Sequence, residues 1–308
     1  MSKKTSEEKK IKASVPRKKA TKQTWKTRAK LGAFLGPSLG GVSVFYMIPF
    51  LVVIFYALVD NPISKRFVFL DNFINVFQNQ AFQLAAWNTL KFSLVAVPLA
   101  VIISLLMAFL LDERIPFASK FRSIYLSPMM VPVASIILVF QVLFNYNGVI
   151  NVIVEFFGGN QVDWFKSDWA PLVVLLLFLW KNLGYNMILF LAALGTIPRE
   201  ALEVALLESS SAWKMFWHIK IRYLSPTILF VTIMSLISSF KVFREVYLLT
   251  GDYPYDSLYT LQHFMNNTFR QLDYQKLSSA AIIMAAVMVV IIGALYIFEN
   301  WFGKDMEE

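Results

Sequence analysis

Long apolar stretches alternate with shorter polar segments along almost the whole chain. Each stretch has about 20 residues or more, which is enough for an α-helix to cross the hydrocarbon core of a bilayer. The strands of a membrane β-barrel would instead alternate apolar and polar positions, so the pattern excludes a barrel. We predict an all-α integral membrane protein with six transmembrane helices. The six stretches are residues 31–58, 92–111, 124–144, 169–194, 226–249 and 277–302.

The polar segment between the fourth and fifth stretches has a pattern of its own, which predicts two short amphipathic helices. Pro198 stands where a helix favours proline, at its first position. Three serines at 209–211 break the pattern, and we expect Pro226 to close the second helix. The large aromatic rings of this segment are Trp213, Phe216 and Trp217. These rings have to be covered, either by the bilayer surface or by a groove on a soluble partner, and the spacing leaves both readings open.

Polar and charged residues interrupt the fourth and fifth apolar stretches. Lys181 lies in the middle of the fourth stretch, and Lys241 lies within the fifth. Charges are costly in lipid and mostly face protein, water or a substrate path. Arg244 lies close enough to the outer edge to extend its charge to the interface, and Glu245 beside it is a candidate partner. A structural pairing role for Lys181 is as consistent with the pattern as a cavity-lining role. The candidates for a substrate path are Lys181, Asn182, Tyr185, Asn186 and Lys241. The alternative, equally consistent with the pattern, is that these groups seal a contact with a partner subunit.

Composition supports the membrane assignment. Hydrophobic residues make up 57% of the chain and charged residues 16%, whereas soluble domains have about 45–50% and about 25%. The net charge of +9 belongs to residues 1–30, which hold 12 Lys and Arg and two Glu. We therefore predict a basic, disordered cytoplasmic tail over residues 1–30 and a membrane domain over residues 31–308. A nucleic-acid-binding fold would spread its positive charge over a folded face, so no nucleic-acid partner is expected.

The placement of Lys and Arg in the loops predicts the orientation. With a cytoplasmic N-terminus, the inner loops beyond the tail hold 8 basic residues and the outer loops hold 5. Because basic residues concentrate on the cytoplasmic side, both termini and the segment at 196–226 are predicted to be cytoplasmic. The expected location is a bacterial plasma membrane, with membrane lipid as one of the partners.

Several kinds of chemistry are missing from the sequence. The chain has no Cys, and its two His residues fall in loops predicted on opposite sides of the membrane, so no metal site or catalytic residue is expected. No phosphate-binding G-x-x-x-x-G-K-[ST] string occurs, so the chain has no ATPase motif of its own. A membrane-embedded enzyme would need clustered acids, His or a nucleophile at one membrane depth, and the sequence offers no such cluster. A self-sufficient secondary transporter would be supported by inverted repeats, and no convincing repeat is visible.

The cytoplasmic segment resembles the signature loop of bacterial ABC importer permeases, E-A-A, three residues, G, nine residues, I-x-L-P. Residues 203–205 take the E-A-A place, Ser209 the glycine, and Ile219 and Ile221 the I-x-L positions. Val204, Ser209 and Arg222 depart from the usual alanine, glycine and proline. The resemblance covers about residues 30–302 and is to the six-span carbohydrate permeases of the maltose and glycerol-phosphate type.

This resemblance implies a permease subunit of an ATP-driven importer for a carbohydrate, an oligosaccharide in particular. It implies a heterodimer with a second homologous permease, an extracytoplasmic solute-binding protein, and a cytoplasmic ABC ATPase dimer that binds ATP and Mg. A secondary transporter and a membrane enzyme remain the alternatives. The residues expected to couple the chain to the ATPase are Glu203, Ala205, Ser209, Trp213, Phe216, Trp217 and Ile219.

Overall fold

The computed structural model describes residues 25–112, 118–198, 200, 203 and 215–303. Within these residues the chain is helical, and an isolated bridge between Val59 and Phe67 is the only strand-like pairing. The chain divides into two units, Met1–Val52 and Val53–Glu308. The all-α prediction is confirmed. The predicted tail lies outside the described residues up to residue 24, and its boundary at residue 30 stays a prediction.

The first unit holds the first apolar stretch. Helix α2 covers Trp25–Val42, a π-helical turn covers Ser43–Met47, and α3 starts at Ile48 and ends at Ala57 in the second unit. Together they give 28 helical residues from Lys30 to Ala57 that are apolar enough to cross a membrane. Pro37 lies inside α2, as membrane helices tolerate when neighbouring groups satisfy the freed carbonyl.

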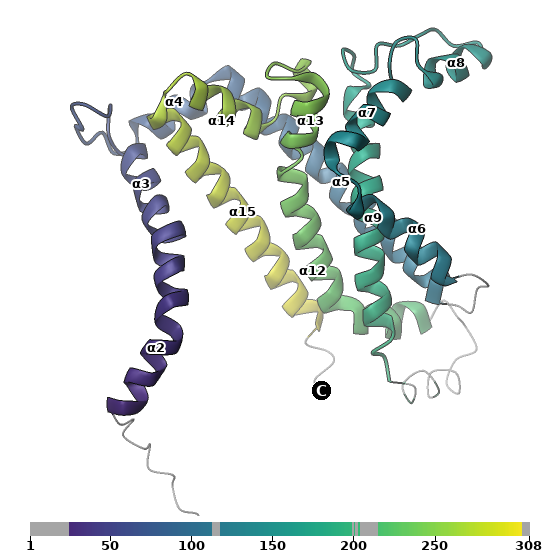
Figure 1. The fold of residues 1–308 in the computed structure, drawn as a ribbon, viewed down its shortest axis with the longest axis horizontal. Coiled ribbons are helices and arrows are strands. Elements are labelled where there is room, and N and C mark those ends of the chain that lie inside the picture. Colours follow the sequence, from purple (N-terminus) through teal and green to yellow (C-terminus); the bar gives the residue numbers. More distant parts are fainter. Residues whose placement is uncertain (1–24, 113–117, 199, 201–202, 204–214, 304–308) are drawn as a thin grey trace, which may run out of the picture. The chain divides into compact units, whose positions relative to one another are not determined.

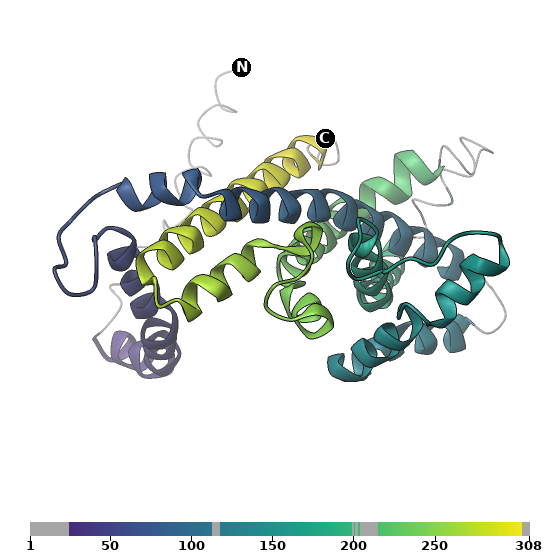
Figure 2. The same ribbon diagram turned by 90° about the horizontal axis from the view of Figure 1, so that it is seen from above.

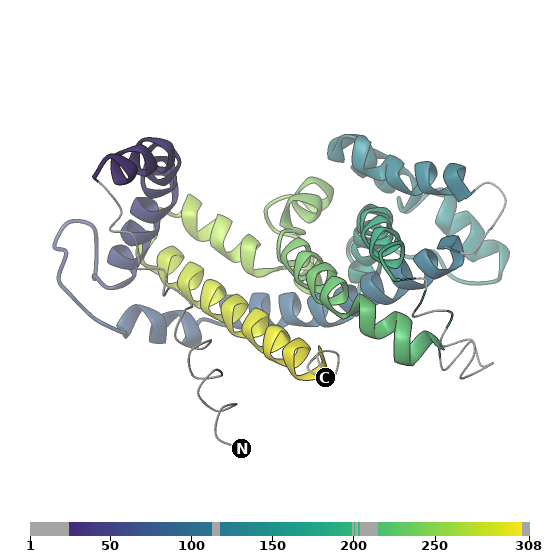
Figure 3. The same ribbon diagram turned by 90° about the horizontal axis from the view of Figure 1, so that it is seen from below.

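Four long helices form the core of the second unit: α5 (Gln80–Asp112), α9 (Ala170–Leu194), α12 (Ile221–Phe240) and α15 (Tyr274–Gly303). Helix α5 packs along α9 and α12, and α12 also contacts α9 and α15 (Figures 1 and 3). The buried face of α5 carries small side chains, with Ala96, Ala100, Ser104 and Ala108 fully buried. Small residues let membrane helices approach closely, where van der Waals contact replaces the hydrophobic effect.

Buried polar side chains connect these helices. Ser93 of α5 and Ser239 of α12 lie 2.8 Å apart between their hydroxyl oxygens. The Asn186 amide of α9 donates to Ser235 of α12 at 2.9 Å. Hydrogen bonds of this kind hold membrane helices in register, because an unpaired polar group is costly in hydrocarbon.

The third apolar stretch, predicted as a transmembrane helix over residues 124–144, is broken by a sharp bend. It forms α6 (Ala118–Met130) and α7 (Val133–Leu143), which meet at an angle of 99° (Figure 1). Pro132 explains the break, since proline lacks an amide donor and disfavours the helical conformation of the residue before it. The six predicted spans therefore correspond to five helices and this bent pair.

The fifth stretch begins earlier than predicted and is interrupted before its end. A π-helical turn at Phe216–Lys220, here called η2, leads into α12, which continues through Pro226. The expectation that Pro226 closes a separate helix is wrong. The apolar residues on both sides continue as one membrane helix, in which an internal proline is tolerated. The chain then breaks at Lys241 and Val242 and restarts as α13 (Phe243–Thr250).

Short helices connect the spans: α4 (Asp71–Gln78), α8 (Val149–Phe156), the 3₁₀ turn η3 (Asp256–Leu258) and α14 (Leu261–Arg270). Helix α14 packs against α5 and α15, as Figure 2 shows. The Asn88 amide of α5 donates to the carbonyls of Asp256 at 2.6 Å and Tyr259 at 3.0 Å. This side chain therefore fixes the segment before α14, and so the position of α14 against α5 and α15.

Candidate functional site

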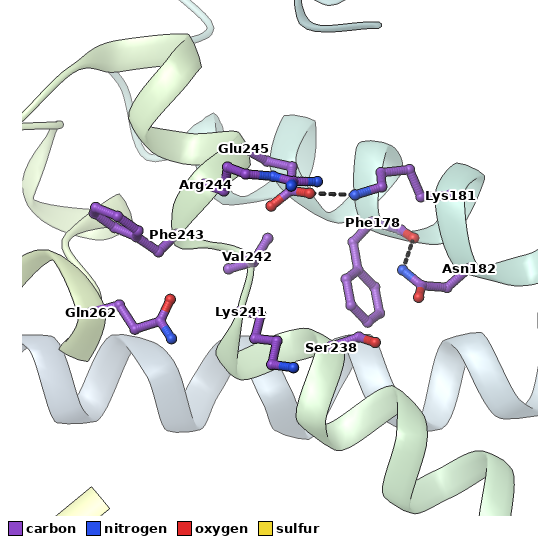
Figure 4. A pocket seen from close by; sticks show the side chains of 10 residues that line it. All are labelled: Phe178, Lys181, Asn182, Ser238, Lys241, Val242, Phe243, Arg244, Glu245 and Gln262. Carbon is purple, nitrogen blue, oxygen red and sulfur yellow. Dashed lines mark hydrogen bonds and ion pairs between the residues drawn. The ribbon is translucent and has the colours of Figure 1, made fainter. Parts of the chain in front are cut away.

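A cavity of about 420 Å³ lies where α12 ends and α13 begins (Figure 4). The helix α9 forms one wall about halfway along its length, at residues 178–182. The break between α12 and α13 forms another wall, and Gln262 of α14 completes the lining of the cavity. The lining residues are Phe178, Lys181, Asn182, Ser238, Lys241, Val242, Phe243, Arg244, Glu245 and Gln262.

The break itself is a tightened helix end followed at once by a new helix start. The Lys241 amide donates to the carbonyls of Ile237 at 3.3 Å and Ser238 at 3.1 Å, so the last turn of α12 mixes two hydrogen-bond spacings. The amides of Glu245 and Val246 both donate to the Val242 carbonyl at 3.1 Å. Lys241 therefore lies at a helix C-terminus and Glu245 in a first helical turn, each on the side that the helix dipole favours.

Lys181 and Glu245 form an ion pair across the cavity wall, from α9 to α13 (Figure 4). The Lys181 side chain is 25% exposed and that of Glu245 is 8% exposed. The two roles left open for Lys181 by the sequence are thus combined, because its side chain lines the cavity and is paired. Glu245 bonds to this distant lysine and not to its neighbour Arg244, the partner that the sequence suggested.

Lys241 and Arg244 contribute the other charges of the cavity. Both side chains are exposed, and within the part of the chain that the structure describes neither has an ion pair. A Lys or Arg at the centre of a membrane helix costs about 2.5–3.5 kcal/mol on insertion scales. The favourable interaction of Lys241 with the C-terminal end of α12 offsets only about 0.3–1 kcal/mol of such a cost.

The structure brings together Lys181, Asn182 and Lys241, three of the five candidates for a substrate path. The Asn182 amide donates to the Phe178 carbonyl at 2.7 Å. Asn186 is 2% exposed and bonds to α12, away from the cavity, and Tyr185 does not line it either. Gln262 also lines the cavity and was not predicted, because the sequence pattern does not indicate that the loop after the fifth span returns to this point.

The candidate coupling residues are only partly described. Ala205, Ser209 and Trp213 lie outside the described residues, and Glu203 is helical and exposed. The Phe216 ring packs on Phe109 near the end of α5, with ring centroids 4.7 Å apart. Trp217 is 49% exposed and meets Phe216 edge-on. The half-buried Ile219 lies in the same π-helical turn.

An ion pair reinforces this contact. The Lys220 ammonium lies 3.7 Å from an Asp112 carboxylate oxygen and 5.5 Å from the centre of the Phe109 ring. The start of α12 is therefore joined to the end of α5 within the chain itself. Phe216 is covered by α5 of its own chain, a third possibility beside the bilayer and a soluble partner.

Comparison with known families identifies the chain. Residues 100–308 match the family described as the inner membrane component of binding-protein-dependent transport systems. The chain belongs to this family. Its match includes both walls of the cavity and the contacts of Phe109 and Asp112, at the end of α5, with residues 216–220.

Individual relatives extend this result to nearly the whole permease. It is 28% identical to the lactose transport system permease protein LacF of Rhizobium radiobacter over 273 residues, which is 86% of this chain and 92% of that protein. It is 29% identical to the trehalose/maltose permease protein MalF of Thermococcus litoralis over 283 residues, 90% and 96% of the two chains. A crystal structure of a bacterial alginate ABC transporter with its alginate-bound periplasmic protein shares the fold, with a TM-score of 0.78 and 20% identity over 92% of this chain and 99% of that one.

These findings confirm the prediction of an importer permease. The family consists of transport proteins that work with an ATPase and a binding protein, and its relatives are permeases, not enzymes. The permease is therefore a multi-pass protein of the inner membrane. Among the described residues, no group of three or more His, Cys, Asp or Glu side chains could hold a metal ion.

A buried histidine of the permease lies next to the cavity. His263 of α14 is 0% exposed, and its ring meets that of the lining residue Phe243 at 4.6 Å between centroids. Its Nδ1 lies 2.9 Å from the hydroxyl of Thr260, the N-cap of α14, while its Nε2 has no partner in the described structure. Burial lowers the pKa of His263 to about 4, and the charge of Asp252 acts in the opposite direction.

We expect this histidine to make the stability of the permease depend on pH. Its pKa is lower in the folded chain than in the unfolded chain, so the unfolded chain binds more protons between about pH 4 and pH 6.5. The contribution of His263 to the free energy of unfolding is fully present above pH 6.5. It falls by about 3 kcal/mol as the pH drops from about 6.5 to about 4. Thermal unfolding of the purified protein from pH 4 to pH 8 measures it. His263→Gln, which retains a side chain able to complete the N-terminal cap, should flatten the slope. An equal slope in both proteins would contradict the assignment.

Proposed function

We propose that this chain is the transmembrane subunit of an ATP-driven importer for a carbohydrate, in particular an oligosaccharide. The observation that carries the proposal is the match over 86–90% of the chain with permeases named for lactose and for trehalose and maltose. A further relative, from Bacillus subtilis, is named for arabinooligosaccharides and is 26% identical over 84% of this chain. In this proposal a second homologous permease forms a heterodimer with the chain, and both termini lie in the cytoplasm.

ATP hydrolysis is proposed to take place on a partner ATPase dimer, which binds ATP and Mg. The absence of a phosphate-binding loop in the sequence supports this division of labour. The chain itself then contributes no catalytic residue and needs no cofactor of its own. Its part is to convert movement of the ATPase into a change of the membrane helices.

The segment at 198–226 is proposed to receive this movement. The contacts of Phe216 with Phe109 and of Lys220 with Asp112 would pass it to the end of α5. Helix α12 would pass it outward, because its 20 residues form a continuous rod about 30 Å long from Ile221 to the break at Lys241. A push on the cytoplasmic end would therefore reach the cavity, where Lys181, Asn182 and Lys241 are proposed to lie on the substrate path.

The coupling role predicts the effect of a charge reversal at Glu203. In the complete complex reconstituted into proteoliposomes, Glu203→Lys should lower both ATP-dependent oligosaccharide uptake and substrate-stimulated ATPase activity at least tenfold. The exposed carboxylate is proposed to make a polar contact with the ATPase, and a lysine would oppose it.

The matched control is Glu155→Lys, which makes the same charge change on the exposed surface of α8 and should leave both activities near wild type. Membrane insertion of both variants is checked by extraction and size-exclusion chromatography. Unchanged stimulated ATPase activity in Glu203→Lys would refute the coupling role of this residue. If the wild-type complex imports no oligosaccharide on addition of ATP, the carbohydrate function itself is wrong.

A further inference from the structure

We propose that the cavity at the break between α12 and α13 binds an anionic group of the transported sugar, so that the cargo is an acidic saccharide. This inference rests on the proposed function of carbohydrate import and specifies its substrate class. The anionic group would be a carboxylate, a sulfonate or a phosphate, since each accepts charge-assisted hydrogen bonds from ammonium and guanidinium groups.

The first argument is the charge of the lining. Of the ten lining residues, Lys181, Lys241 and Arg244 are cations and Glu245 is the one anion. Glu245 pairs with Lys181, so this carboxylate is already used. Lys241 and Arg244 have no ion pair in the described part of the chain and leave the cavity with two positive charges.

The second argument is the position of these two charges. They lie beside residues 178–182 of α9, about halfway along a helix that crosses the membrane, where cations are costly and usually mark a pathway for a substrate or an ion. Lys241 follows the last residue of α12 and Arg244 is in the first turn of α13. Figure 4 shows the two side chains on different sides of Val242, so that they can hold a ligand from two directions.

The third argument is the chemistry of the remaining lining. Asn182, Ser238 and Gln262 offer amide and hydroxyl groups suited to sugar hydroxyls. The rings of Phe178 and Phe243 offer flat apolar surface for a sugar face. The volume of about 420 Å³ lies within the range of small-molecule sites. A small inorganic anion would contact the cations and leave the neutral groups and the rings without a ligand. An acidic saccharide can contact the cations, the amide and hydroxyl groups and the aromatic rings together.

The test compares two trisaccharides in the complete complex, with its ATPase and binding protein, reconstituted into phosphatidylcholine vesicles. Trigalacturonate carries three carboxylates, and maltotriose is neutral. We expect ATP-dependent uptake of trigalacturonate to be at least tenfold faster than that of maltotriose at equal low concentration.

In the double variant Lys241→Gln/Arg244→Gln the ratio of the two uptake rates should fall at least tenfold. The variant Lys241→Arg, which keeps the charge, should retain the wild-type ratio. Phosphatidylcholine has no net charge, so these vesicles exclude a lipid of net negative charge as the source of the effect.

The control variant is Lys166→Gln, which removes an exposed cation outside the cavity and should leave the ratio unchanged. Faster uptake of maltotriose by the wild type, or a double variant that keeps the full ratio, would overturn the inference and leave carbohydrate import intact. No ATP-dependent uptake of either sugar would instead overturn the proposed function on which the inference rests.

Discussion

Replacing Gly184 with alanine should disrupt the packing of α6 on α9. Among the glycines of the described helices, this is the position at which an added Cβ atom would make the shortest contact. A Cβ atom at this position would lie 1.7 Å from the Tyr125 carbonyl oxygen and 2.5 Å from its carbon. Both are backbone atoms, so no side chain can rotate away and α6 has to move. Overpacking usually costs about 1–3 kcal/mol, and we expect about 3 kcal/mol here because a whole helix shifts.

Thermal unfolding of the purified permease in detergent measures this loss. The matched control is Gly293→Ala in α15, where a Cβ atom would meet nothing within 4 Å. Both variants add one methyl group to a membrane helix, so a difference between them reports the close approach at Gly184. A Gly184→Ala protein as stable as Gly293→Ala would mean that α6 and α9 are not held together at this point.

The six spans could be predicted from the sequence because their length and apolar character are local properties. The bend between α6 and α7 was signalled by Pro132, yet a hydropathy pattern gives no angle, and 99° depends on packing against neighbouring helices. Pro226 shows the opposite case, since a residue that often ends helices lies inside α12. In a membrane the backbone has few alternatives to a helix. The membrane environment therefore outweighs the tendency of Pro226 to end a helix.

The candidate cavity could be predicted in part, from charges that lipid does not accommodate. Lys181 and Lys241 are predicted site residues for this reason, and both line the cavity. Asn182 and Asn186 lie four residues apart and share a helical face, but only the first lines the cavity, because Ser235 of α12 lies opposite the second. Periodicity predicts which residues share a face of a helix. It does not predict which neighbouring helix each of these residues contacts. The pairing of Lys181 with Glu245, 64 residues away, has no local signal at all.

Removing the negative charge of Glu245 should destabilise the permease strongly. Glu245→Gln leaves the partly buried Lys181 without its counter-charge and raises the net charge of the cavity lining from +2 to +3. Breaking a buried pair by changing one partner costs about 3–5 kcal/mol. The Lys181 side chain is 25% exposed, so water screens part of this loss and we expect about 3 kcal/mol in thermal unfolding.

A double-mutant cycle separates the pairing from the surrounding packing. Lys181→Met and Glu245→Gln are compared singly and together, and the double variant should lose less stability than the sum of the two by more than about 1 kcal/mol. The reason is physical: once Lys181 is apolar, the carboxylate at 245 is itself unpaired, and its removal no longer exposes a buried cation. Additive losses would mean that water in the cavity already hydrates Lys181 fully. In that case its charge would be available to a ligand together with those of Lys241 and Arg244, so the cycle also determines how many cations the cavity can offer to an acidic cargo.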